Sequence, residues 1–167
     1  MCKLGDIIVV NKYIGDDGKE IGRHSFIVID DNEDSIKGLE YTHVTAVISS
    51  FKSEEQKSKK LQFEENMEID TFEKNGNTLK FKKPSYIKAD KLFYFNKNKL
   101  DYFVFARISD DLLDELMKLI LHLSEEDKLT IVTENLWYKF DNLINYCYNT
   151  RTNQLILYNF LCIILVR

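Results

Sequence analysis

An arginine and a histidine, Arg23 and His24, stand side by side directly before an apolar run of strand composition. A guanidinium group is permanently charged, and its geometry matches the oxygens of a phosphate. An imidazole titrates near neutrality and can accept or donate a proton. Since neighbouring side chains of a strand point to opposite faces, the pair can serve one site only if the backbone at residues 22–24 is still loop-like, as Gly22 permits. The pair therefore predicts phosphate chemistry. The alternative is a surface arginine beside a histidine that begins a strand.

Two further pairs carry groups of the same kind. Ser49 and Ser50 end a second apolar run, where a hydroxyl can hydrogen-bond to a phosphate oxygen, although serines at strand ends are also ordinary turn formers. Lys88 and Asp90 are two positions apart and so project from one face of a strand. Together they could bind a phosphate and orient or exchange a proton. The alternative is an exposed ion pair, which contributes little to stability.

These groups match the needs of RNA cleavage without a metal ion. That reaction requires a base for the 2′-hydroxyl proton, a cation beside the phosphoryl oxygens and an acid for the leaving 5′-oxygen. Residues 80–99 favour the same substrate, because they hold seven lysines and one acidic residue, Asp90. Lysines neutralise phosphates and aromatic rings stack on bases. About half of the rings interspersed there are expected in the core; they are Phe81, Tyr86, Phe93, Tyr94 and Phe95.

The elements that must position these residues are mostly short strands. Apolar and β-branched runs predict strands at 5–10, 25–29, 44–48, 61–70, 78–82, 85–92 and 102–106. Asn75-Gly76 is a hairpin signal. Residues 11–21 and 51–60 are expected to be loops. Residues 110–123 predict a helix with Ser109 as its N-cap. A run of short strands closed by one helix indicates a mainly β fold with α decoration (α+β), a small β-barrel followed by C-terminal helices.

Composition places the chain among ordinary globular proteins. We expect a barrel domain at 1–124 and a C-terminal extension at 125–167, with a helix at 133–148 and an apolar terminal element at 155–166 that packs on the barrel or on a partner. That element is shorter than the roughly 20 residues of a membrane span. Widely spaced cysteines argue against a zinc site and against a disulfide framework. With no signal-peptide pattern, the prediction is a cytoplasmic protein without a membrane partner. A net charge of −4 leaves nucleic-acid binding open, since binding needs only a local basic patch.

Several segments in order resemble the MazF/PemK (Kid) family of toxin endoribonucleases over residues 4–124. The matching segments are Gly5-Asp6 before a strand, Glu20–His24, the strand at 25–29 with the turn at 30–32, the strand at 44–49, and residues 85–100 before a helix. The resemblance implies an SH3-like barrel and a toxin that cleaves single-stranded RNA with no metal and no cofactor. It also implies a homodimer and a cognate antitoxin that occupies the substrate groove.

The resemblance also assigns roles to residues. The position of the family's catalytic threonine falls on Ser49. The family's usual Arg-Pro before the second strand is replaced by His24-Ser25, with Arg23 one position earlier. An arginine of the family's late segment falls on Phe93. We therefore predict Arg23, His24 and Ser49 as catalytic residues. The predicted substrate-binding residues are Ser50, Lys88 and Asp90. Two alternatives stay open: a non-catalytic RNA- or protein-binding module on the same barrel, and a structural protein that assembles through its apolar C-terminal segment.

Overall fold

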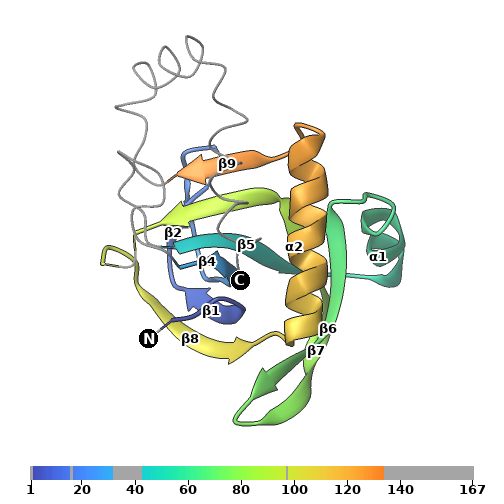
Figure 1. Cartoon of the computed structure of the whole chain (residues 1–167), viewed down its shortest axis with the longest axis horizontal. Helices are drawn as coiled ribbons and strands as arrows, with labels where there is room; N and C mark the ends of the chain where they lie inside the picture. Colours follow the sequence, from blue (N-terminus) through green and yellow to red (C-terminus); the bar gives the residue numbers. More distant parts are fainter. Residues whose placement is uncertain (1, 16, 32–42, 97, 134–167) are drawn as a thin grey trace.

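Six antiparallel strands close into a small barrel in the computed structural model, which describes residues 2–15, 17–31, 43–96 and 98–133 (Figure 1). The strands follow one another around the barrel as β5-β4-β1-β8-β6-β7, and β7 pairs back with β5. Their bounds are β1 Asp6–Val10, β4 His24–Asp30, β5 His43–Ser50, β6 Asn66–Lys74, β7 Asn77–Phe95 and β8 Tyr102–Arg107. The predicted fold class, mainly β with helical decoration, is confirmed.

The central strands are buried on both faces. Because side chains alternate along a strand, Ile7 of β1 belongs to one apolar cluster and Ile8 to another. The first cluster includes residues of α2 (Asp110–Glu125), which begins after the N-cap Ser109 as predicted. The second includes a group of aromatic rings contributed by Tyr13, Phe26, Phe93 and Phe95. Burial on both faces explains why these strands read as continuous apolar runs.

The long strand β7 organises one side of the barrel. Asn75 and Gly76 have φ of 53° and 77°, and Lys74 pairs with Asn77 around them, so the hairpin predicted from Asn75-Gly76 is confirmed, and its turn has two residues. The tip of this β6–β7 hairpin projects beyond the barrel (Figure 1). The prediction of separate strands at 78–82 and 85–92 was wrong, because β7 runs through both. A bulge makes this possible: Ile69 pairs with Ser85 and Thr71 with Lys80, so residues 81–84 of β7 face only one residue of β6. Pro84 lies in that bulge, where its missing N–H breaks no regular ladder.

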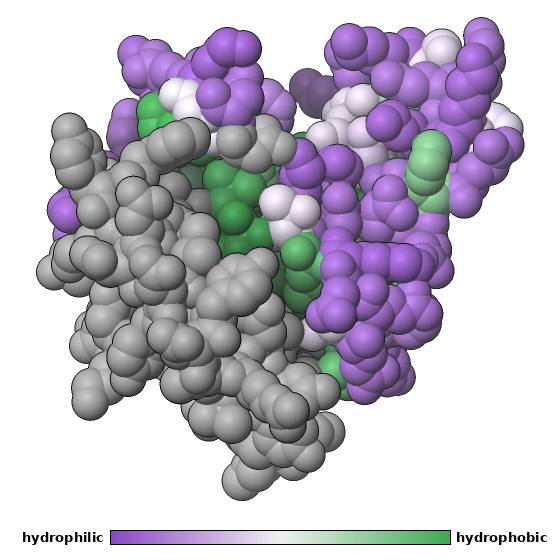
Figure 2. Space-filling view, turned by 90° about the horizontal axis from the view of Figure 1, so that it is seen from above, coloured by the Kyte–Doolittle hydropathy of each residue, from purple (hydrophilic) through white to green (hydrophobic). Residues whose placement is uncertain are grey.

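The predicted loop at 51–60 was also wrong, because residues 54–60 form the helix α1, Glu54–Lys60. Its N-terminal end is stabilised locally: Ser53 Oγ accepts a hydrogen bond from Gln56 N at 3.1 Å, and Gln56 Oε1 accepts one from Lys52 N. No residue of α1 is buried, and hydrophilic side chains dominate the side of the described surface where α1 and α2 lie (Figure 2). A helix without an apolar face gives no periodic signal, although its N-capping residues are visible in the sequence.

Three short strands complete the described chain. β2 (Tyr13–Ile14) and β3 (Glu20–Ile21) form a small hairpin inside the segment predicted as the loop 11–21. β9 (Thr130–Thr133) was not predicted and pairs in parallel with residues 91–94 of β7. The rest of the predicted helix at 133–148 and the element at 155–166 lie outside the described residues, so the domain division stays a prediction. Within the described residues, no helix is both long and apolar enough to cross a bilayer.

Candidate functional site

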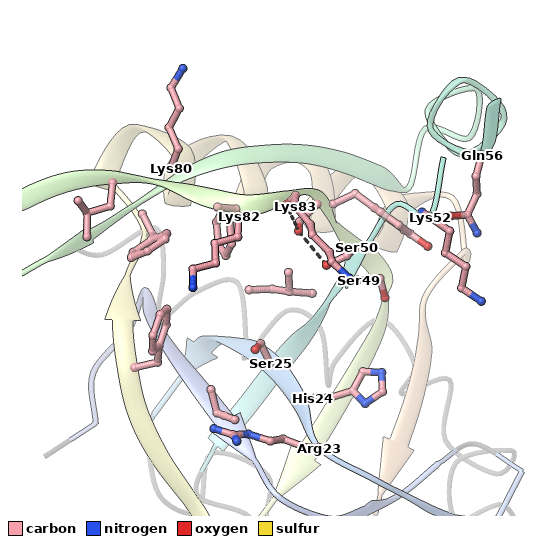
Figure 3. Close-up of a pocket in the computed structure, with 18 residues that line it drawn as sticks. Arg23, His24, Ser25, Ser49, Ser50, Lys52, Gln56, Lys80, Lys82 and Lys83 are labelled. Atoms are coloured by element: carbon pink, nitrogen blue, oxygen red, sulfur yellow. Dashed lines mark hydrogen bonds between the residues drawn. The ribbon is translucent and has the colours of Figure 1, made fainter. Parts of the chain in front are cut away.

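A groove of about 1080 Å³ opens where several parts of the chain meet (Figure 3). It is lined by Val9 of β1, the start of β4, the end of β5, Lys52 and Gln56 at the start of α1, the β6–β7 hairpin, and β8. The groove brings together four of the six predicted site residues, namely Arg23, His24, Ser49 and Ser50. Residues that are far apart in the sequence meet here because β5 pairs with β4 on one side and with β7 on the other.

All charged side chains that line the groove are cationic. They are Arg23, Lys52, Lys80, Lys82 and Lys83, and no described carboxylate lines it. Lys82 and Lys83 come from the bulge of β7, whose position is held by a hydrogen bond from Phe51 N to Pro84 O at 2.9 Å. Figure 3 shows Lys82 pointing into the cavity and Lys80 pointing away from it. Such a lining attracts a polyanion.

Arg23, which precedes β4, and His24, which begins it, both line the groove, and their side chains extend in opposite directions (Figure 3). The loop-like backbone that the sequence required at residues 22–24 is therefore found at Gly22 and Arg23 but not at His24, which already pairs with Val10 of β1. Arg23 is exposed, and its guanidinium carbon lies 5.3 Å from the ring centre of Phe103, a cation–π distance. The arginine therefore sits at the rim, with its charge available to a ligand.

His24 has a defined tautomer in this geometry. Its Nδ1 lies 3.1 Å from Gly22 O. A carbonyl oxygen can only accept, so Nδ1 carries the hydrogen and donates it. In the neutral ring, Nε2 then holds the lone pair and is able to take a proton. The edge of the half-buried imidazole also meets the ring of Tyr13, with centroids 5.7 Å apart, which further fixes its orientation.

The two adjacent serines differ in what they can donate. Ser85 Oγ donates to Lys83 O at 2.9 Å, and a hydroxyl has a single hydrogen. In the 3.2 Å contact between Ser50 Oγ and Ser85 Oγ, Ser50 is therefore the donor. The Ser49 hydroxyl makes no hydrogen bond to any residue that the structure describes. Ser49 is thus the serine whose hydrogen is available to a ligand in the groove.

Lys88 and Asp90 do not line the groove. They face each other as their spacing predicts, with Nζ 3.9 Å from Oδ1 and side chains 25% and 21% exposed. Both lie where β7 leaves its regular pairing with β5: Val47 pairs with Lys88, but Ala46 pairs with Leu92. The pair therefore sits at a distortion of the strand, apart from the other predicted site residues.

Sequence reasoning missed several groove residues. Lys80, Lys82 and Lys83 belong to the lysine-rich stretch that was noted, but nothing in the sequence separated them from the lysines elsewhere in it. Lys52 was assigned to a solvated loop, and Phe72 and Phe105 gave no signal beyond ordinary strand composition. Phe93, at the position of the family's arginine, is 5% exposed and packs in the core instead.

The fold and the groove define a small antiparallel β-barrel with a cationic, histidine-containing groove. Comparison with protein families and with curated proteins finds no match to this chain. The resemblance to the MazF/PemK family therefore remains a prediction from the sequence.

Proposed function

We propose that this protein is an endoribonuclease that cleaves single-stranded RNA in the groove without a metal ion. One observation carries the proposal: His24 and Ser49 line a groove whose charged side chains are all cationic, Lys82 among them pointing into the cavity, and no described carboxylate lines it. A phosphodiester chain would be attracted to this lining, and the imidazole would lie beside it.

In the proposed reaction each group has its own role. The Arg23 guanidinium and the Ser49 hydroxyl bind non-bridging oxygens of the RNA backbone, and a cation or hydrogen-bond donor beside the reacting phosphate stabilises the charge that develops there. His24 Nε2 takes the proton of the adjacent 2′-hydroxyl, and the 2′-oxygen attacks the phosphorus. The bond from phosphorus to the 5′-oxygen breaks, and the leaving oxygen takes a proton from the imidazolium or from water. The products are a 2′,3′-cyclic phosphate and a free 5′-hydroxyl.

A second function, RNA binding without cleavage, is favoured by one feature of the same site. The reaction needs both a base and an acid, and the groove offers a single histidine and no described carboxylate. Asp90, which the resemblance placed at the site, does not line it. If one imidazole is insufficient for both transfers, the groove would bind RNA and release it intact.

Incubation of the purified protein with a long single-stranded RNA in EDTA tests the proposal. We expect discrete fragments with cyclic phosphate ends, and a loss of rate of at least about a hundredfold in His24→Ala. His122→Ala is the matched control, because His122 lies exposed on α2 outside the groove. Equal rates in wild type and His24→Ala would remove the histidine from the mechanism, and intact RNA in every lane would favour the binding module.

The toxin role, the antitoxin and the homodimer rest on the family resemblance. Induced expression should arrest growth if the protein is a toxin, and His24→Ala should relieve the arrest. Light scattering on the purified chain measures whether it is a dimer.

A further inference from the structure

Besides its cations, the groove contains a cluster of three aromatic rings, Phe72 of β6, Phe81 of β7 and Phe105 of β8. The ring centres of Phe72 and Phe81 are 4.9 Å apart, and those of Phe72 and Phe105 are 5.3 Å apart. We call these three rings the aromatic cluster. Leu79, which is 43% exposed, lines the same groove and extends its apolar surface.

The three rings are not equally available to a ligand. Phe72 is buried, with 8% of its surface exposed, and its ring packs against the rings of the other two. Lys74 Nζ lies 4.2 Å from the ring centre of Phe105 and covers one face of that half-buried ring. Phe81 is half-buried and lies at the start of the bulge of β7. It is therefore the ring of the cluster best placed to contact a ligand.

The cations beside the cluster indicate what kind of ligand it takes. Phe81 is followed directly by Lys82, which points into the cavity (Figure 3), and by Lys83, which also lines it. Apolar ring surface next to cationic groups suits a molecule with flat apolar faces and regularly spaced negative charges. Single-stranded RNA has that pattern, because each unpaired base presents a π-face beside a phosphate.

We propose that Phe81, supported by Phe72 and Phe105, stacks on an unpaired base of single-stranded RNA whose phosphate binds Lys82. The inference rests on the proposed function in so far as RNA must occupy the groove. The aromatic cluster then selects single strands, since the bases of a duplex are already stacked on one another. Figure 3 shows Lys82 and His24 on different sides of the cavity, so the stacked base sets which phosphate reaches His24.

The test measures binding, separately from cleavage, with fluorescently labelled 2′-O-methyl oligonucleotides that lack the attacking hydroxyl. One oligonucleotide is intact, and matched ones carry an abasic position at successive sites. For wild type we expect one abasic position to weaken binding by about 5- to 150-fold, the range of a single base–aromatic stack. The variant Phe81→Leu should lose this discrimination, while Phe81→Tyr, which retains the ring, should keep it.

Phe63→Leu is the matched control, because Phe63 is 54% exposed and does not line the groove. Thermal melting of each variant shows that its fold is retained. If wild type binds every abasic oligonucleotide as tightly as the intact one, or if Phe81→Leu discriminates as wild type does, the stacking role is overturned.

The EDTA cleavage assay separates this failure from a failure of the proposed function. If wild type cleaves RNA but binds every abasic oligonucleotide as tightly as the intact one, only the stacking role is overturned. If wild type binds the intact oligonucleotide more tightly than an abasic one, loses this difference in Phe81→Leu, and cleaves no RNA, the stacking role is supported and the proposed nuclease activity is overturned. Absence of both binding and cleavage overturns both.

Discussion

Ser50 donates a hydrogen bond to Ser85 across the pair of strands β5 and β7, over 3.2 Å between the two hydroxyl oxygens. Phosphate oxygens can only accept, so a serine whose hydrogen is already used contributes little to binding them. Ser49, its neighbour, has its hydrogen available. The geometry therefore distinguishes two serines that the sequence treated almost alike.

We predict that Ser49→Ala slows cleavage by about tenfold or more, since a hydrogen bond to a charged group contributes about 1.5–3 kcal/mol. Ser50→Ala should leave the rate nearly unchanged and lower the free energy of unfolding by about 0.5–1.5 kcal/mol, because it removes a neutral hydrogen bond. Single-turnover cleavage and urea denaturation measure the two effects. A slower reaction in Ser50→Ala than in Ser49→Ala would contradict the assignment.

The lysines of the bulge should control how salt weakens RNA binding. Each phosphate contact to a single strand contributes about −0.7 to the slope of log K against log salt concentration. Lys82→Ala and Lys83→Ala should each make the slope less steep by about that amount, whereas Lys118→Ala, on the exposed face of α2, should not change it. The slope is measured by fluorescence anisotropy over a salt series. A change as large in Lys118→Ala would mean that attraction by the whole protein, and not the groove, determines binding.

Lys88 and Asp90 are predicted by resemblance to bind substrate, but they lie outside the groove. From their position we expect Lys88→Ala and Asp90→Asn to leave the cleavage rate within a few-fold of wild type. Their main effect should be on stability, because Asp90 Oδ1 is buried without a hydrogen-bond partner among the described residues and Lys88 is its nearby cation. Rate and melting temperature are compared for both variants. A large loss of rate with unchanged melting would restore them to the active site.

Stability should fall at alkaline pH. Burial raises the pKa of Tyr94 above its ordinary value of 10.0, and the carboxylate of Asp30 raises it further. Burial, helped by Asp6, likewise raises the pKa of Cys2 from 9.0 to about 12. At a pH above these ordinary pKa values, the folded state therefore binds more protons than the unfolded state. The stabilisation is complete below pH 9 and is lost as the pH rises above 9.0 for Cys2 and above 10.0 for Tyr94.

Urea denaturation at a series of pH values measures this loss. Tyr94→Phe should reduce the decline above pH 10, whatever its effect on stability at neutral pH, because phenylalanine does not ionise. An unchanged pH dependence in Tyr94→Phe would show that another group governs the alkaline transition.

Sequence alone determined the features that depend on neighbouring residues. Asn75-Gly76 specifies a tight hairpin turn because both positions need a positive φ, and Ser109 with the apolar period after it specifies α2. Strands with continuous apolar runs were recognised because burial on both faces selects such residues. The sequence also predicted the strand at 25–29, which the structure begins one residue earlier, at His24. These signals act within a few residues of the chain.

Only the tertiary structure decided which residues share the groove. Lys82 and Lys83 reach the groove from a bulge of β7, a strand that pairs with β6, β5 and β9 in turn, and no local pattern specifies that register. Lys88 and Asp90 lie at a second irregularity of β7, where its pairing with β5 shifts, and they do not line the groove. The pairing of β5 with β4, in which Ile48 lies opposite Ser25, brings Ser49 beside the start of β4, although the two segments are distant in the sequence. Strand register is a property of the whole closed sheet, so a single chain segment cannot reveal it.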